Sequence, residues 1–264
     1  MNNQSMPAIF IGHGSPMNAL ENNNCTQQWR DLAMRLPKPR AILVISAHWY
    51  TQSATAITAQ IQNQTIHDFY GFPPQLANYD YPSQGSIALA EETVAEIKPE
   101  FEIKIAHNEW GLDHGVWSIL THMYPTPDMP ILQLSIDARQ DANYHYNLGK
   151  KLASLRQNGI LIMASGNIVH NLGLLNWHKP NAAYDWAVEF DQKIITAIQN
   201  RDVLSLTNYL TLTPMAQSAV PTPDHYLPLL YIIGASNYGD KLTIFNQEYQ
   251  YGSLSMTSIM FDKA

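Results

Sequence analysis

Cysteine is almost absent from this chain of 264 residues, which contains only Cys25. No intrachain disulfide can form, and a metal site built from several thiolates is excluded. Positive charge is also scarce, since 15 Lys and Arg residues stand against 22 Asp and Glu residues and the net charge is −7. Because a chain of this charge repels phosphate backbones, we predict no nucleic-acid partner.

Long apolar runs are missing as well. No stretch reaches the roughly 18 uninterrupted apolar residues of a membrane span, so no membrane partner is expected. Residues 1–5 carry neither the positive nor the apolar segment of a secretory signal, so we expect a cytoplasmic protein, as a monomer or a small homo-oligomer. No linker, charge block or repeat marks a boundary, and residues 1–264 are expected to form a single domain.

Three short apolar runs each end at small residues that carry or precede a histidine. Residues 8–11 lead to Gly12-His13-Gly14, residues 41–45 lead to Ser46-Ala47-His48, and residues 160–163 lead to a small-residue segment followed by His170. Continuous apolar runs of this length indicate strands buried on both faces of a parallel sheet. Ligands of open α/β sheets bind outside the carboxyl ends of the strands, so loops at these ends can bring the three histidines to one metal.

Segments of helical periodicity alternate with the strands, which predicts an α/β fold with a mostly parallel central sheet flanked by helices. Further strands are predicted at 103–106, 131–136, 242–245 and 252–261, the last two forming an antiparallel edge because no helix separates them. The predicted inward stripes are Ile87, Ala90, Val94 and Ile97 after a capping Ser86 and before Pro99; Tyr144, Leu148, Leu152 and Leu155 before Asn158-Gly159; and Trp186, Phe190, Ile194 and Ile198.

Two aromatic segments are predicted to be irregular surface loops, residues 65–82 and residues 109–117 around His114. They either carry binding groups or cover an edge of the core. Near the C-terminus, Thr222 is expected to cap a helix with Pro223 at its first position, which places His225 in the first turn. His225 is therefore a fourth candidate ligand, or a helix-end histidine without a special role.

Histidine ligands without cysteine suit zinc, iron, nickel or copper better than calcium or magnesium. The sequence contains no His-Glu-x-x-His helix, no Gly-x-Gly-x-x-Gly or Walker loop, and no Gly-x-Ser-x-Gly turn, so those enzyme classes are disfavoured. Taken one at a time, Asp68, Asp113 and Asp224 are interpreted as solvated loop carboxylates or caps. The histidines at 107, 122, 145 and 178 are interpreted as ordinary packing or surface residues.

Six ordered segments carry a family resemblance: Gly12–Met17, Ser46–Trp49, Ile66–Pro73, Gly111–Trp117, Ser165–Leu172 and Pro223–Leu230. On these segments the chain resembles, nearly from end to end, the 4,5-DOPA extradiol dioxygenase family, a branch of the class III extradiol ring-cleaving dioxygenases. The resemblance implies a single α/β domain with a mononuclear metal, with Fe(II) expected for activity and Zn(II) as a possible occupant or native metal.

The resemblance also implies roles for particular residues. His13, His48 and His225 would bind the metal, and His170 would be either the acid/base beside it or a fourth ligand. His114 would lie in the substrate pocket and serve as a second proton donor. The wider class uses two histidines and one glutamate, whereas here no carboxylate takes the third place, and Asp224 is expected to point away from the site.

The predicted function is therefore the opening of a DOPA-like catechol by O₂, with both as small-molecule partners. Trp49 and Tyr226 are candidates for binding the flat substrate ring, or else they are packing residues. Two alternatives are a zinc hydrolase using the same site, with His170 as general base, and a relative that binds ligands without catalysis.

Overall fold

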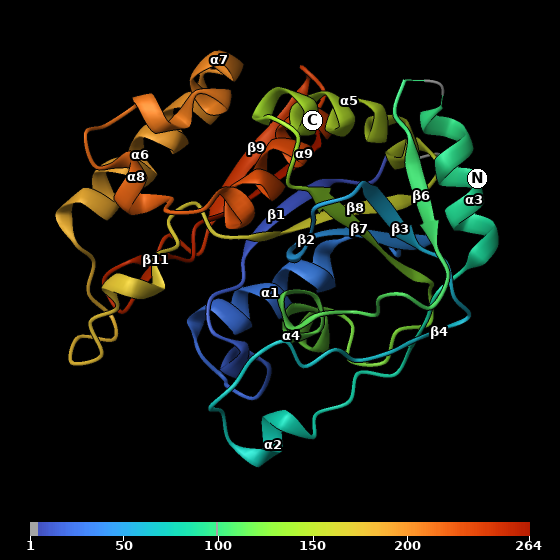
Figure 1. The fold of residues 1–264 in the computed structure, drawn as a ribbon, viewed down its shortest axis with the longest axis horizontal. Coiled ribbons are helices and arrows are strands. Elements are labelled where there is room, and N and C mark those ends of the chain that lie inside the picture. The colour runs from blue at the N-terminus through green and yellow to red at the C-terminus, as the bar shows by residue number, and fades with distance from the viewer. Residues whose placement is uncertain (1–4, 99) are drawn as a thin grey trace.

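In the computed structural model, which describes residues 5–98 and 100–264, the central strands are β1 (Ala8–Gly12), β2 (Ala41–Thr51), β3 (Thr55–Thr58), β6 (Ile103–Ala106), β7 (Ile131–Asp137), β8 (Ile160–Gly166), β9 (Asp240–Phe245) and β12 (Ser258–Lys263). They form one sheet in the order β6-β3-β7-β2-β8-β1-β12-β9 (Figure 1). Two small ladders lie outside it, β4 (Gln62–Asn63) with β5 (Ser83–Gln84) and β10 (Tyr249–Gln250) with β11 (Leu254–Ser255).

The middle of the sheet is parallel, as predicted. Strands β7, β2, β8 and β1 run in one direction. Strands β12 and β9 add the predicted antiparallel edge next to β1. At the other edge, β3 is antiparallel to β7 and parallel to β6, a second reversal that the sequence did not predict. The carboxyl ends of β1, β2 and β8 therefore lie side by side.

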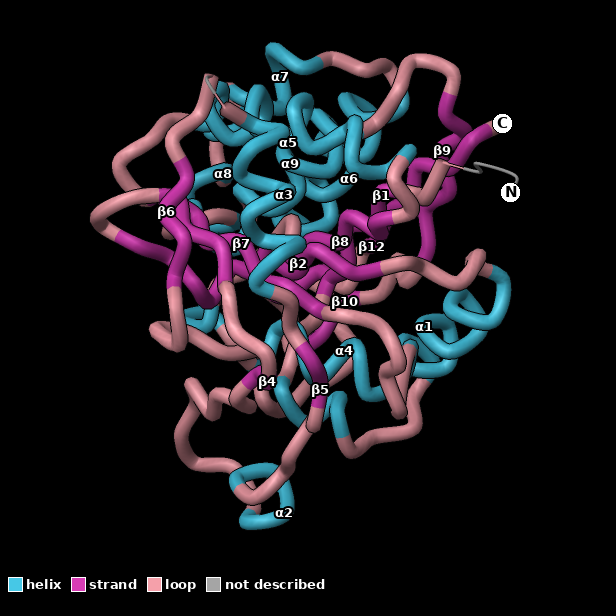
Figure 2. The backbone as a smooth tube through the Cα atoms, turned by 90° about the vertical axis from the view of Figure 1, so that its right-hand side faces the viewer, coloured by secondary structure: helices cyan, strands magenta, loops and turns pink. Residues whose placement is uncertain are grey.

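The helices are α1 (Asn24–Arg35), α2 (Pro74–Ala77), α3 (Ile87–Ile97), α4 (His114–Met123), α5 (Ala142–Gln157), α6 (Asp185–Gln199), α7 (Val203–Thr207), α8 (Ala216–Ala219) and α9 (Leu227–Ala235), with 3₁₀ turns η1 (Pro16–Ala19), η2 (Leu172–Leu174), η3 (Tyr209–Thr211) and η4 (Pro223–His225). Figure 2 shows α3, α5, α6 and α9 on one side of the sheet and α1 and α4 on the other. Both faces are covered, which completes a single α/β domain.

The two layers explain why a central strand such as β1 is apolar at successive positions. In β1, Phe10 packs in the cluster that contains α5 and α9, whereas Ile9 and Ile11 pack in the cluster that contains α1 and α4. All three side chains are fully buried. Because successive residues of a strand face opposite sides, a sheet covered on both faces needs apolar residues at every position.

The three helices predicted from inward stripes form, and two predicted boundary signals are confirmed. The Ser86 side chain accepts from the backbone N–H of Leu89 at the start of α3, and Gly159 has φ +77° just beyond the end of α5. The first residues of all three stripes are less buried than expected, since Ile87 is 36% exposed and Tyr144 and Trp186 are half-buried. The predicted stop at Pro99 lies outside the described residues.

Three local expectations are wrong. Residues 46–49 are not a loop, because β2 continues to Thr51 and pairs again with β7 beyond an irregularity. Residues 109–117 are not wholly irregular, because the backbone carbonyl of Asp113 accepts from two N–H groups of a helix that begins at His114. Residues 252–261 are not one strand, because a turn at Met256, held by the Ser258 hydroxyl, separates β11 from β12.

The C-terminal helix also begins differently from the expectation. Thr222 is the N-cap residue, but its side chain makes no capping hydrogen bond. A 3₁₀ turn from Pro223 comes first, and α9 starts only at Leu227. His225 therefore ends a tight turn instead of lying in a regular first helical turn.

Within the described ranges 5–98 and 100–264, no helix combines the length and the apolar character that crossing a lipid bilayer requires.

His145 makes stability depend on pH away from the functional site. Its ring is fully buried against the Tyr231 hydroxyl, 2.9 Å from Nδ1, and burial lowers the pKa of His145 to about 4. Between pH 6.5 and 4 the unfolded state then binds a proton that the folded state does not, so the free energy of unfolding falls as pH falls, by up to about 3 kcal/mol from this group.

We expect His145→Gln to lose this part of the slope, because glutamine keeps an acceptor for Tyr231 but does not titrate. Urea unfolding of both proteins at several values between pH 4 and pH 8 measures the difference. The site histidines are common to both proteins and cancel in the comparison. Parallel curves for the two proteins would contradict the prediction.

Candidate metal centre

The carboxyl-end edge of the sheet positions the candidate ligands. His13 directly follows β1, and His48 lies in β2, where β2 advances from residue 45 to 50 while β7 advances from 134 to 136. The three extra residues of β2 form a bulge that carries His48. His225 ends η4, which lies against Gly166 at the end of β8, where a Cβ would stand 2.2 Å from the His225 carbonyl oxygen. Glycine is thus required at position 166 for this approach.

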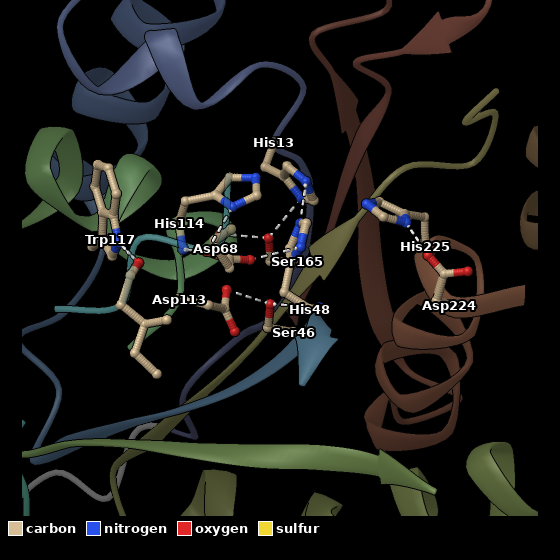
Figure 3. A network of polar contacts seen from close by, with 12 residues as sticks. His13, Ser46, His48, Asp68, Asp113, His114, Trp117, Ser165, Asp224 and His225 are labelled. Atoms are coloured by element: carbon tan, nitrogen blue, oxygen red, sulfur yellow. Dashed lines mark hydrogen bonds and ion pairs between the residues drawn. The ribbon is translucent and has the colours of Figure 1, made fainter. Parts of the chain in front are cut away.

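The rings of three predicted ligands converge. The ring centroids of His13, His48 and His225 lie 5.0 to 5.3 Å apart, and each offers one nitrogen within 4.8 Å of the others. The Nε2 atoms of His13 and His48 are 3.1 Å apart. Figure 3 shows His225 pointing toward the other two rings, with Asp224 behind it. The structure therefore brings together residues separated by more than 200 positions in the sequence.

Hydrogen bonds on the outer side of each ring orient these nitrogens. His13 Nδ1 lies 3.0 Å from the Ser165 hydroxyl, which itself donates to the Gly115 carbonyl oxygen and so must accept from the ring. His48 Nδ1 donates to Asp68, and His225 Nδ1 donates to Asp224. A neutral imidazole has one N–H, so each Nε2 carries a lone pair.

When all three rings are neutral, their Nε2 lone pairs face one another, an arrangement that a bound cation stabilises. The His225 Nε2 atom is buried and has no hydrogen-bond partner among the described residues, and two unprotonated Nε2 atoms at 3.1 Å repel each other. Nitrogens that bind one ion at about 2.0–2.1 Å each come to a similar separation. Second-sphere acceptors on Nδ1 are the usual companions of metal-bound histidine. The donor set fits a mononuclear transition metal.

Electrostatics favour neutral rings at two of these positions. Burial, followed by the nearby histidines, lowers the pKa of His13 and of His225 well below the usual value. At His48, burial is opposed by the hydrogen bond that the ring donates to Asp68 and by the charge of Asp113, and the pKa is raised. Both neutral rings are ready to donate a lone pair to a metal at neutral pH.

His114 and Asp68 adjoin the three ligands. The His114 ring is 3.9 Å from that of His48, and its Nδ1 donates to Asp68 Oδ1 at 2.9 Å. Burial alone would raise the pKa of Asp68, but the hydrogen bonds from His114 and His48 outweigh it and lower the pKa. His48, Asp68 and His114 also form a second group with spacing suited to a metal.

His170 lies at the edge of the cluster and outside both metal groups. Its ring stacks on His225, with 3.5 Å between centroids and 4° between planes. Burial lowers the pKa of His170 to about 4, so the ring is neutral at pH 7. Its backbone is fixed by the N–H bond to the Ala219 carbonyl oxygen and by a bridge to Leu254.

The two aromatic residues predicted to bind substrate lie in packing positions. Tyr226 is fully buried, and its hydroxyl donates to the Leu206 carbonyl oxygen, so we correct its assignment to a core residue. Trp49 is 7% exposed and stacks on Trp110, and its contact with substrate stays a prediction. Phe69 is the aromatic ring beside the site, 5.6 Å from His114.

The interpretation of three aspartates as solvated or capping groups holds only for the backbone of Asp113, which occupies the N-cap position of α4 although its side chain does not cap the helix. Asp68 holds two site histidines, and Asp224, expected to point elsewhere, accepts from the ring of the next residue. Asp113 is fully buried, where it accepts from Ser46 and Gln133, and burial raises its pKa. The signal in the sequence was that Asp68 and Asp224 each lie next to a histidine in a segment that carries the family resemblance.

Comparisons with known proteins agree with this geometry. The family described as the catalytic LigB subunit of aromatic ring-opening dioxygenase matches residues 7–261. The chain belongs to this family. A relative from Escherichia coli K12 named 4,5-DOPA dioxygenase extradiol is 45% identical over 98% of this chain and 96% of the relative. A protein of the same name from Beta vulgaris is 35% identical over 96% of this chain and 95% of its own length.

A solved structure shares the fold of this family member. The crystal structure of an uncharacterized Escherichia coli K12 protein superposes with a TM-score of 0.84 at 41% sequence identity, covering 97% of this chain and 99% of that one. The predicted family and fold are thereby confirmed. A metal cofactor follows from membership of the family together with the histidine cluster.

Proposed function

We propose that this protein is an extradiol ring-cleaving dioxygenase that opens a catechol with O₂ at a single metal ion held by His13, His48 and His225. The observation that carries the proposal is the convergence of three imidazoles whose Nδ1 atoms are held by hydrogen bonds, with no hydrogen-bond partner for His225 Nε2 among the described residues. Membership of a ring-opening dioxygenase family supports the reaction class.

We propose Fe(II) as the active metal. When bound, Fe(II) would hold catechol and O₂ next to each other and lower the pKa of the catechol hydroxyl. Three neutral imidazoles contribute no negative charge, a donor set that also suits Zn(II), so zinc can occupy the same ligands. The presence of all three histidines together with their Nδ1 partners favours a metal enzyme over a relative that only binds ligands.

We assign His170 the role of accepting the catechol proton and returning it during ring opening. It is neutral at pH 7, and in the part of the chain that the structure describes no other side chain hydrogen-bonds to its ring. The stacking of His170 on His225, outside the group of His13, His48 and His225, supports this role. His114, whose Nδ1 is held by Asp68, is the second residue that we place against substrate.

The substrate that we propose is a DOPA-like catechol, after the names of the relatives from Escherichia coli and Beta vulgaris. Phe69 is available beside His114 to pack on a flat ring. Trp49 as a substrate contact, cytoplasmic location and a monomer or small homo-oligomer remain predictions.

Metal exchange tests the proposed function. Protein stripped with a chelator and reloaded anaerobically with Fe(II) is expected to consume O₂ when a catechol is added and to form a yellow product, one O₂ for each ring opened. The same protein loaded with Zn(II) is expected to consume none. Hydrolysis by the zinc form without oxygen demand would instead identify a zinc hydrolase, and indifference to both metals would identify a binding protein.

A further inference from the structure

One carboxylate joins two histidines of the site from outside the sheet. Asp68 Oδ2 lies 3.0 Å from His48 Nδ1, while Oδ1 lies 2.9 Å from His114 Nδ1 and 3.0 Å from the His114 backbone nitrogen. The three side chains are 18%, 17% and 7% exposed, so water competes little for these bonds. Asp68 comes from the aromatic segment 65–82, which Figure 3 shows reaching the site beside His114.

The hydrogen-bond inventory fixes the tautomers of both rings. The backbone N–H of His114 can only donate, so Oδ1 of Asp68 is an acceptor. An ionised carboxylate has no hydrogen to offer, so His48 and His114 must each donate from Nδ1. Each neutral ring then has its lone pair on Nε2.

We propose that Asp68 is a shared positioning residue, which holds His48 in the tautomer that binds the metal through Nε2 and His114 in the tautomer that presents an Nε2 lone pair to a substrate hydroxyl. The substrate part rests on the proposed function. The tautomers and the metal affinity do not, because they are measured without turnover.

A second metal at Asp68 is the competing interpretation, since His48, Asp68 and His114 have suitable spacing. That ion would need the Nδ1 lone pairs of both rings and would leave His48 Nε2 protonated. The group formed by His13, His48 and His225 would then lose one of its three nitrogen donors, His48 Nε2. The 3.1 Å separation between the Nε2 atoms of His13 and His48 favours the arrangement in which His48 Nε2 faces the first site.

Asp68→Asn tests the proposal because the amide offers one acceptor and one donor. The ring that faces the NH₂ group must move its proton to Nε2. We expect the affinity for Zn(II), measured by competition with a chromophoric chelator, to fall 10–100-fold, the effect typical of removing such a partner. Long-range ¹H–¹⁵N spectra of histidine-labelled, zinc-loaded protein are expected to show Nδ1–H tautomers for His48 and His114 in the wild type and a changed tautomer in the variant.

Two further variants separate positioning from folding. Asp80→Asn is the matched control, because Asp80 lies in the same segment and accepts from the Thr65 hydroxyl at 2.7 Å without contacting a histidine. It is expected to keep wild-type zinc affinity. Asp68→Glu keeps an acceptor-only carboxylate and is expected to recover part of the affinity lost in Asp68→Asn, together with the Nδ1–H signals.

Three results would overturn the proposal: unchanged zinc affinity in Asp68→Asn, an Nε2–H tautomer for His48 in the wild type, or two zinc ions per wild-type chain of which the variant loses one. Failure of the proposed function is a separate outcome. Iron-loaded wild-type protein that consumes no O₂ with a catechol would contradict the dioxygenase assignment, while the affinity and tautomer readouts would still decide the role of Asp68.

Discussion

His225→Ala is expected to bind no stoichiometric metal and to lower metal-dependent oxygen uptake by at least about 10³-fold. The metal ion is worth several kcal/mol of transition-state stabilisation, and each 1.36 kcal/mol corresponds to a factor of ten in rate. The change removes one of three converging lone pairs and leaves Asp224 on the outer side of the site without a ring to orient.

The fold should survive this substitution. His225 ends a short turn, and the backbone bond from Asn167 N–H to the His225 carbonyl oxygen does not depend on the side chain. Metal content by mass spectrometry and oxygen uptake after Fe(II) loading are the two measurements. His145→Gln, which changes another buried histidine outside the site, is the control and should keep both.

A His225→Ala protein that still holds one equivalent of metal at wild-type affinity would show that His225 is not a ligand. The metal would then have to lie in the other group, with Asp68 and His114. If His13, His48 and His225 bind one metal ion together, His225→Ala loses both the metal and turnover.

The strands and the histidines at their ends could be predicted because both depend on local patterns. A strand covered on both faces is apolar at every position, as in β1 with Phe10 on one side and Ile9 and Ile11 on the other. The carboxyl ends of parallel strands share an edge, which is why His13 and His48 could be expected to meet. For His225, the place near the start of an apolar helix made it only a candidate, and its role as the third ligand was implied by the family resemblance.

What could not be predicted depends on pairing between distant segments. The bulge that carries His48 exists because β2 pairs again with β7, about 85 residues away, in a shifted register. No pattern within residues 41–51 encodes that shift. Likewise the reversal at β3 is set by a single bridge between Ile57 and Leu134.

The partners of the ligands were missed for the same reason. Asp68 reaches His48 and His114 from the irregular part of segment 65–82 that precedes α2, and its position depends on anchors such as the Trp117 indole N–H donating to the Ile66 carbonyl oxygen. Tyr226 was misassigned because the sequence does not say to which side of η4 each side chain points. In the structure His225 faces the site and Tyr226 faces the core.

His170→Gln is expected to keep the metal and lose turnover by about 10²–10⁴-fold, the usual contribution of a general acid–base group. Glutamine can hydrogen-bond to substrate but cannot take up and return a proton near neutral pH. If proton transfer is the role of His170, kcat and kcat/KM fall by the same factor, because the interaction is made only in the transition state.

Metal affinity separates the two roles that the family resemblance left open for His170. As a proton carrier stacked on His225, it can be replaced with little change in zinc affinity, measured by chelator competition. If His170 is instead a fourth ligand, replacing it lowers both the zinc affinity and turnover. Full turnover in His170→Gln would remove His170 from the reaction. His114, whose Nδ1 donates to Asp68 and whose Nε2 has no hydrogen-bond partner among the described residues, would then be the histidine assigned to carry the proton.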